Sequence, residues 1–300
     1  EIAQCLVGSE MCIRDSGITC SADIGLMSIS YTCFDGESSF SHALSLTTTG
    51  VNTSRLNRLE HFVSDFPAEG IHMSGEALHS QLDEIERIHG LYSPAALGLA
   101  SALACGAFTF LLGGGPLEMI LAFAGAGIGN AIRCKLGKHH FTLFMCIAVS
   151  VSSACLVYAG FLKLAELLFH ISVQHEAGYI CSMLFIIPGF PFITSGIDLA
   201  KLDMRSGLER LAYAIIVVMV AAVSAWLMAL LLHLKPVDFL PLELSAAQRI
   251  LFRLLASFCG VFGFSVMFNS PVRLAAAAAF IGALSVSYTH LRAHETLSDL

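Results

Sequence analysis

The sequence predicts an α-helical polytopic membrane protein with a small N-terminal α+β soluble domain. Of its 300 residues, 56% are hydrophobic and only 13% are charged, whereas soluble globular proteins carry about 25% charged residues. The mean hydropathy of the chain is +0.75. Six apolar runs are long enough to cross the roughly 30 Å of a bilayer's hydrocarbon core. They cover residues 95–112, 117–132, 141–160, 179–197, 211–232 and 251–268.

The soluble domain is expected over residues 17–92. Runs 24–34 and 38–46 are rich in serine, threonine and β-branched residues, and the Asp35-Gly36 pair between them predicts a β-hairpin. Asn52 is expected to cap a helix that runs to Phe66, and Ser74 begins a second amphipathic helix. This small α+β domain buries little apolar surface on its own.

Two histidine–aspartate pairs in this domain could suggest a hydrolase or a metal site. His61 and Asp65 are four residues apart, as are His79 and Asp83, so each pair shares one helix face. No nucleophile motif or third metal ligand accompanies them. Solvated pairing along the helix surface is therefore the favoured interpretation.

The membrane region divides into a first half over residues 93–232, with five spans, and the start of a second half over residues 245–284. A seventh apolar run, 271–284, is about 14 residues long and too short to cross. Residues 1–16 and 285–300 look like translated sequencing-adapter sequence and are set aside. We therefore expect the complete protein to be longer at both ends, and this chain alone to transport nothing.

Positive charges in the loops predict the orientation. We expect the protein to lie in the cell membrane with its soluble domain in the cytoplasm. In that orientation seven loop cations lie inside and four outside, as the positive-inside rule requires. The inside residues are Arg133, Lys135, Lys138, Lys201, Arg205, Arg210 and Arg273; the outside ones are Lys163, Lys235, Arg249 and Arg253. The net charge of −7 and the lack of a basic stripe argue against nucleic-acid binding.

The fourth apolar run contains a break that indicates a transport path. Pro188-Gly189 interrupts the run, and a proline frees a backbone carbonyl that lipid cannot satisfy. The hydroxyls of Thr194 and Ser195 follow, and then Asp198. An ionisable side chain beside a broken membrane helix is typical of transporters.

A zwitterionic amino acid would find complementary groups along this segment. Freed carbonyls at 185–187 could take its ammonium, and Thr194 or Ser195 could meet a hydroxyl. Asp198 could hold the ammonium or exchange a coupling proton; alternatively it pairs with Lys201 or Arg205 at the cytoplasmic end.

Other polar residues have open or ordinary roles. Arg210 could orient Asp198 or snorkel to the interface. Asn269, before Pro271, could add a polar group from the second half. Histidines 170 and 175 and Glu176 are expected to be solvated in an outer loop.

Several spaced motifs resemble the threonine/serine exporter family, over about residues 22–284. They are GVNTSRLNRLEHFVSDF (Gly50–Phe66), LDEIERI (Leu82–Ile88), FLLGGGPLEMILAF (Phe110–Phe123), the P-G…D…G-x-x-R pattern (Pro188, Gly189, Asp198, Gly207, Arg210) and FGFSVMFNSPVRL (Phe262–Leu274). The resemblance implies a cytoplasmic N-terminal domain, about ten spans, and two halves that are fused here but form separate subunits in some relatives.

The same resemblance implies export of threonine or serine, driven by the proton gradient, without an enzymatic activity or a cofactor. Its partners would be the lipid bilayer and the amino acid, with a homo-oligomer as a further option. Split relatives are associated with dicarboxylate export, which is the alternative substrate class. A membrane sensor with a cytoplasmic output domain is the alternative outside transport. A channel or a membrane enzyme is disfavoured, because the spans carry few lining groups and only scattered ionisable residues.

Overall fold

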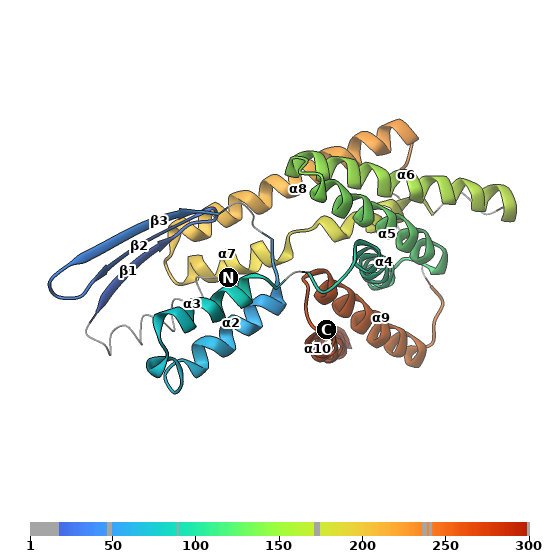
Figure 1. Cartoon of the computed structure of the whole chain (residues 1–300). Helices are drawn as coiled ribbons and strands as arrows, with labels where there is room; N and C mark the ends of the chain where they lie inside the picture. The colour runs from blue at the N-terminus through green and yellow to red at the C-terminus, as the bar shows by residue number, and fades with distance from the viewer. Residues whose placement is uncertain are drawn as a thin grey trace. The chain divides into compact units, whose positions relative to one another are not determined.

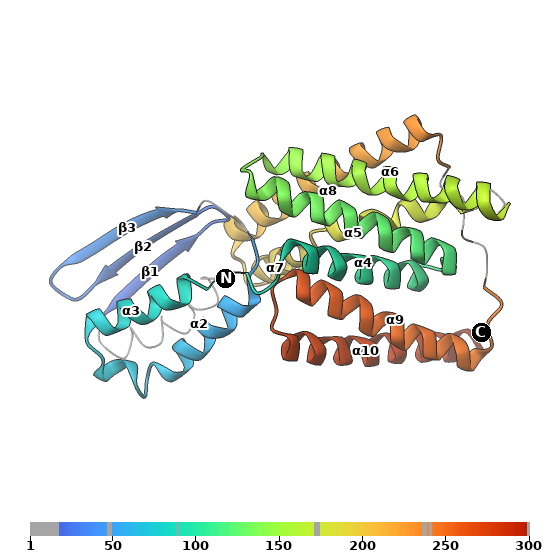
Figure 2. The ribbon, with the colours of Figure 1, turned by 45° about the vertical axis from the view of Figure 1, so that its right-hand side comes forward.

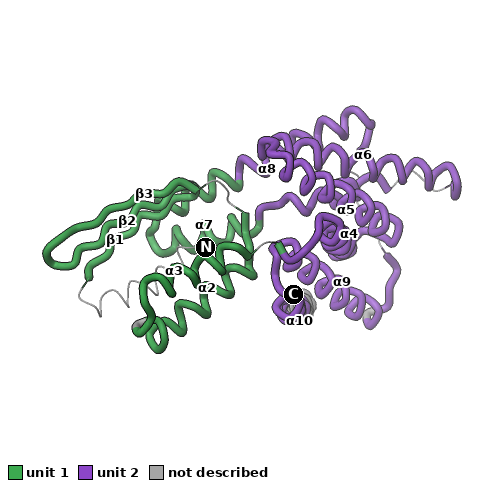
Figure 3. The backbone as a smooth tube through the Cα atoms, viewed as in Figure 1, with its two compact units in different colours: residues 1–90, 189–214 green, residues 91–188, 215–300 purple. Residues whose placement is uncertain are grey.

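The computed structural model describes residues 18–46, 50–88, 90–170, 175–235, 239 and 242–298. It forms two compact units, shown in different colours in Figure 3. Unit 1 contains residues 1–90 and 189–214, and unit 2 contains residues 91–188 and 215–300. The adapter-like segment 1–16 lies outside the described residues, and the origin of both chain ends stays a prediction.

Unit 1 begins with a three-stranded antiparallel sheet in which each strand pairs with the next along the chain (Figure 1). Its strands are β1 (Thr19–Ile24), β2 (Ser28–Phe34) and β3 (Ser39–Ser45). The predicted hairpin at Asp35-Gly36 is confirmed, with Gly36 at a φ of 98° that favours glycine. Strand β1 was not predicted, because its short polar run resembles a loop. It pairs antiparallel with β2 across a tight turn in which the Gly25 N–H donates to the Ser28 carbonyl.

The two predicted helices of the soluble domain are α2 (Thr53–Asp65) and α3 (Gly75–Glu86), joined through the short 3-10 helix η1 (Gly70–His72). Both predicted caps are confirmed. The Asn52 side chain accepts from the Arg55 N–H, and the Ser74 side chain accepts from the Ala77 N–H. Each cap satisfies a backbone donor that the first helical turn leaves without a partner.

Unit 1 also contains α7 (Gly189–Ala200) and the first turns of α8 (Met204–Leu232). The start of α8 is tied to the β1–β2 turn: Leu26 N–H donates to Glu209, the Ser206 hydroxyl donates to the Ile24 carbonyl, and Arg205 pairs with Asp23. Arg205, Ser206 and Glu209 therefore hold the sheet, and Arg205 is not only a loop charge.

Unit 2 is a helical bundle. It contains α4 (Pro94–Leu111), α5 (Pro116–Lys138), α6 (Leu143–Phe169), the rest of α8, α9 (Ala246–Met267) and α10 (Val272–Ser298), with the 3-10 helices η2 (Glu176–Tyr179) and η3 (Cys181–Ile186). Helix α4 packs against α5 and α9, α5 against α6, and α9 against α10 (Figure 2).

The span prediction is confirmed in outline. Five described helices, α4, α5, α6, α8 and α9, are long and apolar enough to cross a membrane. The predicted fourth span is divided into residues 176–186 and 189–200, which count as a sixth span if they are taken as one broken helix. The apolar part of α10, Val272–Val286, is shorter than a span.

Most of the adapter-like segment 285–300 is helical in the structure, since α10 continues to Ser298. This stretch has lost its apolar run but keeps leucine, alanine, arginine and glutamate, which favour helix. The helix α10 can therefore continue past its apolar part, because these residues favour a helix even though they are too polar to span a membrane.

Small residues bring the bundle helices close together. A Cβ atom added at Gly125 would lie 2.8 Å from the Ala154 carbonyl oxygen, and one at Gly129 would lie 2.9 Å from the Ser150 carbonyl oxygen, so α5 approaches α6 at the backbone. Gly98 makes the same approach from α4, where its Cβ would lie 2.9 Å from the Gly127 carbonyl oxygen. Helices in lipid commonly associate through such faces.

Candidate functional site

The break in the fourth apolar run lies at Ile187 and Pro188, between η3 and α7. Pro188 has no N–H to donate, and the Leu184 carbonyl, four residues earlier, instead accepts from the Ile187 N–H at 3.1 Å. The 3-10 form of η3 therefore re-satisfies one of the carbonyls that the proline frees. The expected role of the 185–187 carbonyls in ammonium binding stays a prediction.

Asp198, near the end of α7, pairs with Arg210 of α8, with 3.4 Å between Oδ2 and Nε. Both side chains are mostly buried, at 19% and 16% exposed. Of the partners expected from the sequence, Arg210 is the one that contacts Asp198, while Arg205 pairs with Asp23 and Glu209. Asp198 Oδ2 has no hydrogen bond within the described part of the chain, so it keeps capacity for another donor.

A tight turn brings Asp198 and Arg210 together. The Asp203 N–H donates to the Asp198 carbonyl at 2.9 Å, and Leu202 takes a left-handed conformation with a φ of 65°. The Asp203 side chain then accepts from the Ser206 N–H and so caps the start of α8. Close packing at Gly207, where an added Cβ would lie 2.7 Å from the Leu199 side chain, holds α7 against α8.

The two hydroxyls of α7 are both donating to backbone carbonyls. Thr194 donates to Phe190 at 3.0 Å and to Pro191 at 3.2 Å, within its own helix. Ser195, only 1% exposed, donates across to the Gly207 carbonyl at 2.9 Å. Each hydroxyl oxygen can still accept a hydrogen bond, so the predicted contact with a substrate hydroxyl stays open.

Asn269 has a structural role in unit 2. It lies at the turn between α9 and α10 with a φ of 63°, a conformation that asparagine tolerates. Its side-chain oxygen accepts from the Leu91 N–H at 2.6 Å, while the Tyr92 hydroxyl donates to the Ser270 carbonyl at 2.7 Å. These bonds attach the chain before α4 to the α9–α10 turn.

A second buried carboxylate lies in unit 2 and was missed by the sequence analysis. Glu118, in the first turn of α5, has a side chain 2% exposed, and its Oε1 lies 2.7 Å from Nδ1 of His175. Its other oxygen, Oε2, is buried without a hydrogen-bond partner among the described residues. The available signal was the isolated acid in the otherwise apolar run after Pro116.

The expectation that His175 and Glu176 are plainly solvated is wrong. The His175 side chain is 16% exposed and contacts Glu118, and the Tyr158 hydroxyl of α6 donates to the His175 carbonyl at 2.6 Å. Glu176 accepts from the Lys235 N–H at 2.6 Å. These bonds attach His175 and Glu176 to the helical bundle. The sequence analysis expected both residues to be solvated because the composition around them does not reveal such long-range contacts.

Two glycines make room for this cluster. A Cβ at Gly115 would lie 2.9 Å from Glu118 Oε2, and a Cβ at Gly178 would lie 2.1 Å from the Tyr158 hydroxyl oxygen. Any larger residue at Gly178 would displace the tyrosine.

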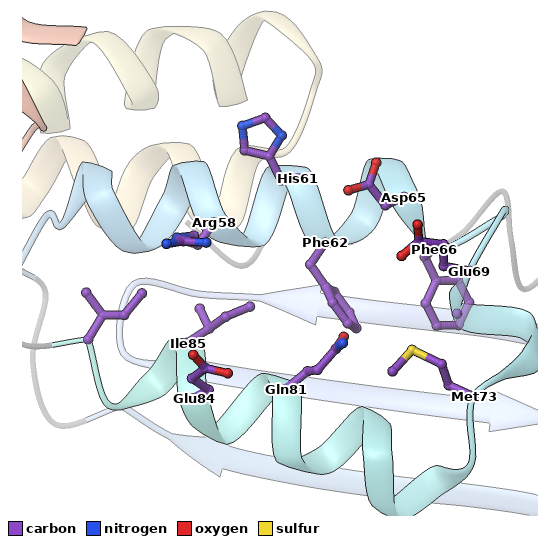
Figure 4. A pocket seen from close by; sticks show the side chains of 12 residues that line it. Arg58, His61, Phe62, Asp65, Phe66, Glu69, Met73, Gln81, Glu84 and Ile85 are labelled. Carbon is purple, nitrogen blue, oxygen red and sulfur yellow. The ribbon is translucent and has the colours of Figure 1, made fainter. Parts of the chain in front are cut away.

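The soluble part of unit 1 carries an open groove of about 330 Å³ between α2 and α3. Figure 4 shows Phe62 of α2 pointing toward α3, while His61 and Asp65 point away from it. All three residues line the groove, as do Arg58 and Glu84. Within the described residues, no group of three or more histidine, cysteine, aspartate or glutamate side chains could hold a metal ion.

Comparison with known proteins gives one finding. Residues 8–233 match the model of the family ThrE, described as "Putative threonine/serine exporter". No curated protein and no solved structure matches the chain. The matched segment includes Glu118, His175, Asp198 and Arg210, and it contains the broken helix together with four of the five complete spans. A match over most of the chain shows that this multi-pass membrane protein belongs to the ThrE family of threonine/serine exporters.

Proposed function

We propose that the protein is a secondary transporter that exports threonine or serine in exchange for protons. The observation that carries the proposal is the Asp198–Arg210 pair near the end of α7, the helix that follows the break in the fourth span. An amino acid presents an ammonium and a carboxylate, which are the counterparts of these two side chains. Asp198 would hold the ammonium, because its Oδ2 still has capacity for a donor, and Arg210 would hold the carboxylate through its planar fork.

Of the two roles open to Asp198, the ammonium role is the better supported. Arg210 is charged at every physiological pH and its Nε lies 3.4 Å from Asp198 Oδ2, so the pair presents one group of each sign to a zwitterion. A substrate ammonium would meet the carboxylate of Asp198, while the substrate carboxylate would meet Arg210. Ser195 and Thr194, three and four residues before Asp198 and so about one helical turn from it, would accept from the substrate hydroxyl.

The same pair disfavours the alternative of dicarboxylate export. A dicarboxylate would gain from Arg210 but would meet the negative charge of Asp198 at close range. The proposed location is the cell membrane, with the soluble domain in the cytoplasm, as the excess of cations in the inside loops supports.

Everted membrane vesicles containing the complete protein test this proposal, because export then appears as uptake. We expect labelled threonine to accumulate when a proton gradient is imposed, and a dicarboxylate not to accumulate. In the same vesicles, added protease should cleave the soluble domain, and in intact cells it should not. Threonine uptake that ignores the gradient, or uptake of the dicarboxylate alone, would contradict the proposal.

The Asp198→Asn variant tests the site. Losing one partner of a desolvated charge pair costs roughly 2–5 kcal/mol, which is more than tenfold in binding. We therefore expect threonine transport to fall by more than about tenfold, with insertion into the membrane unchanged. Asp83→Asn, on the exposed face of α3, is the matched control and should transport as the unmodified protein does. Equal rates for both variants would remove Asp198 from the substrate site.

A further inference from the structure

The pair formed by Glu118 and His175 is not used by the substrate site and differs from it chemically. Its carboxylate is fixed deep in unit 2, and its only charged partner among the described residues is an imidazole, which gains and loses a proton in the physiological range. Burying a carboxylate with one oxygen unsatisfied is costly, and such groups in membrane proteins usually have a function.

We propose that His175 carries the coupling proton, with Glu118 as its buried counter-ion. The inference rests on the proposed function, since it assigns the proton half of the exchange. Nδ1–H of the imidazole donates to Glu118 Oε1 at 2.7 Å, which leaves Nε2 as the atom that gains or loses a proton. Uptake of one proton at Nε2 turns a negatively charged pair into a neutral ion pair, and its release reverses the change.

The surroundings of His175 suit this role. The imidazole is 16% exposed while the carboxylate is 2% exposed, so the titrating ring has access to water and its counter-ion does not. Glu118 lies in the first turn of α5, where the helix dipole interacts favourably with a negative charge. An ion pair of Glu118 and protonated His175 has no net charge, so it is better tolerated in the interior of unit 2 than the carboxylate of Glu118 alone.

The other titratable groups packed around the pair are weak acids or are already bonded. Tyr158 of α6 donates to the His175 carbonyl. Glu176 accepts from the backbone N–H of Lys235, which follows α8. None of these groups offers a fixed positive charge beside the imidazole within the described residues, and Glu118 is the charged group that contacts it there.

Two assays on the complete protein in liposomes separate the proton step from the substrate step. One follows exchange of labelled for unlabelled threonine at equal pH, which moves no net proton. The other follows transport driven by a proton gradient. If the unmodified protein shows neither activity, the proposed function is wrong. If the unmodified protein exchanges threonine, the variants below decide whether His175 carries the proton.

The decisive variant is His175→Asn, whose amide can still donate to Glu118 but cannot take up a proton. We expect threonine exchange to be kept within a few-fold and gradient-driven transport to fall by at least about tenfold. His170→Asn is the matched control, because His170 is exposed and has a left-handed φ of 51° that asparagine tolerates. It should keep both activities.

Glu118→Gln gives a readout that a merely structural role would not produce. Without its counter-ion the imidazolium is less favoured, so the pH dependence of gradient-driven transport should shift to lower pH. Coupling that persists in His175→Asn would overturn the assignment. So would loss of threonine exchange together with coupling, since it would place His175 in substrate handling, and so would an unchanged pH profile in Glu118→Gln.

Discussion

Asp198 in unit 1 and Glu118 in unit 2 are both mostly buried carboxylates with one basic partner each, but the partners differ. Arg210 keeps its charge at all accessible pH values, so each member of the Asp198–Arg210 pair can replace its partner by a charged group of a substrate but Arg210 cannot release a proton. His175 can lose its charge, so its pair can change its total charge. In the two proposals made above, recognition of a zwitterion and storage of a proton are assigned to different pairs because the basicity of the two partners differs.

Replacing Arg210 tests the fixed-charge side of this comparison and should have the largest effect. Arg210→Met leaves Asp198 buried without a cation, which should cost about 3 kcal/mol of stability and abolish threonine exchange. Arg210→Lys keeps the charge but loses the planar fork, and should retain stability with weakened exchange. Thermal unfolding of the purified protein and exchange rates measure both. A methionine variant as stable and active as the unmodified protein would show that the pair is dispensable.

Gly178→Ala tests the titrating side without altering either charged residue. The added methyl group would lie 2.1 Å from the Tyr158 hydroxyl oxygen, so the tyrosine that bonds the His175 carbonyl must move. Overpacking of this kind costs about 1–3 kcal/mol, and gradient-driven transport should fall more than threonine exchange.

The control for that variant is Gly160→Ala in α6, where an added Cβ meets nothing within 4 Å. It should leave stability and both transport activities unchanged. If Gly178→Ala behaves in the same way as this control, the position of Tyr158 does not support His175.

Asp35 supplies a third carboxylate, fully exposed, and should have the smallest effect. Backbone N–H groups of Ser38 and Glu37, with the Ser38 hydroxyl, donate to it and hold its pKa below the ordinary value of 3.8. A lowered pKa in the folded state means that the hairpin is favoured above the ordinary value and loses this support as the pH falls through the lowered pKa. Circular dichroism of the soluble domain within the whole protein, between pH 6 and pH 2, should show a small acid-induced loss of strand signal near the hairpin. Asp35→Asn should remove that dependence, and an identical pH profile in the variant would exclude Asp35 as its source.

Local patterns were sufficient for much of the fold. The hairpin at Asp35-Gly36, the caps at Asn52 and Ser74 and the break at Pro188 all depend on residues close together in sequence, and the structure contains each of them. Strand β1 escaped prediction because its pairing partner, not its own composition, makes it a strand.

Tertiary contacts decided the sites. Asp198 could have paired with Lys201, Arg205 or Arg210, and the tight turn between α7 and α8 selected Arg210. Glu118 and His175 are 57 residues apart, and nothing in the local sequence of either residue points to the other.

The sequence by itself determined that the chain enters a membrane, where it crosses and where one crossing is broken, because hydrophobicity, run length and proline act locally. Only the tertiary structure decided which basic side chain meets each buried carboxylate. A charge in a low-dielectric interior is stabilised by the group that packing brings within a few ångströms, and sequence spacing does not report that distance.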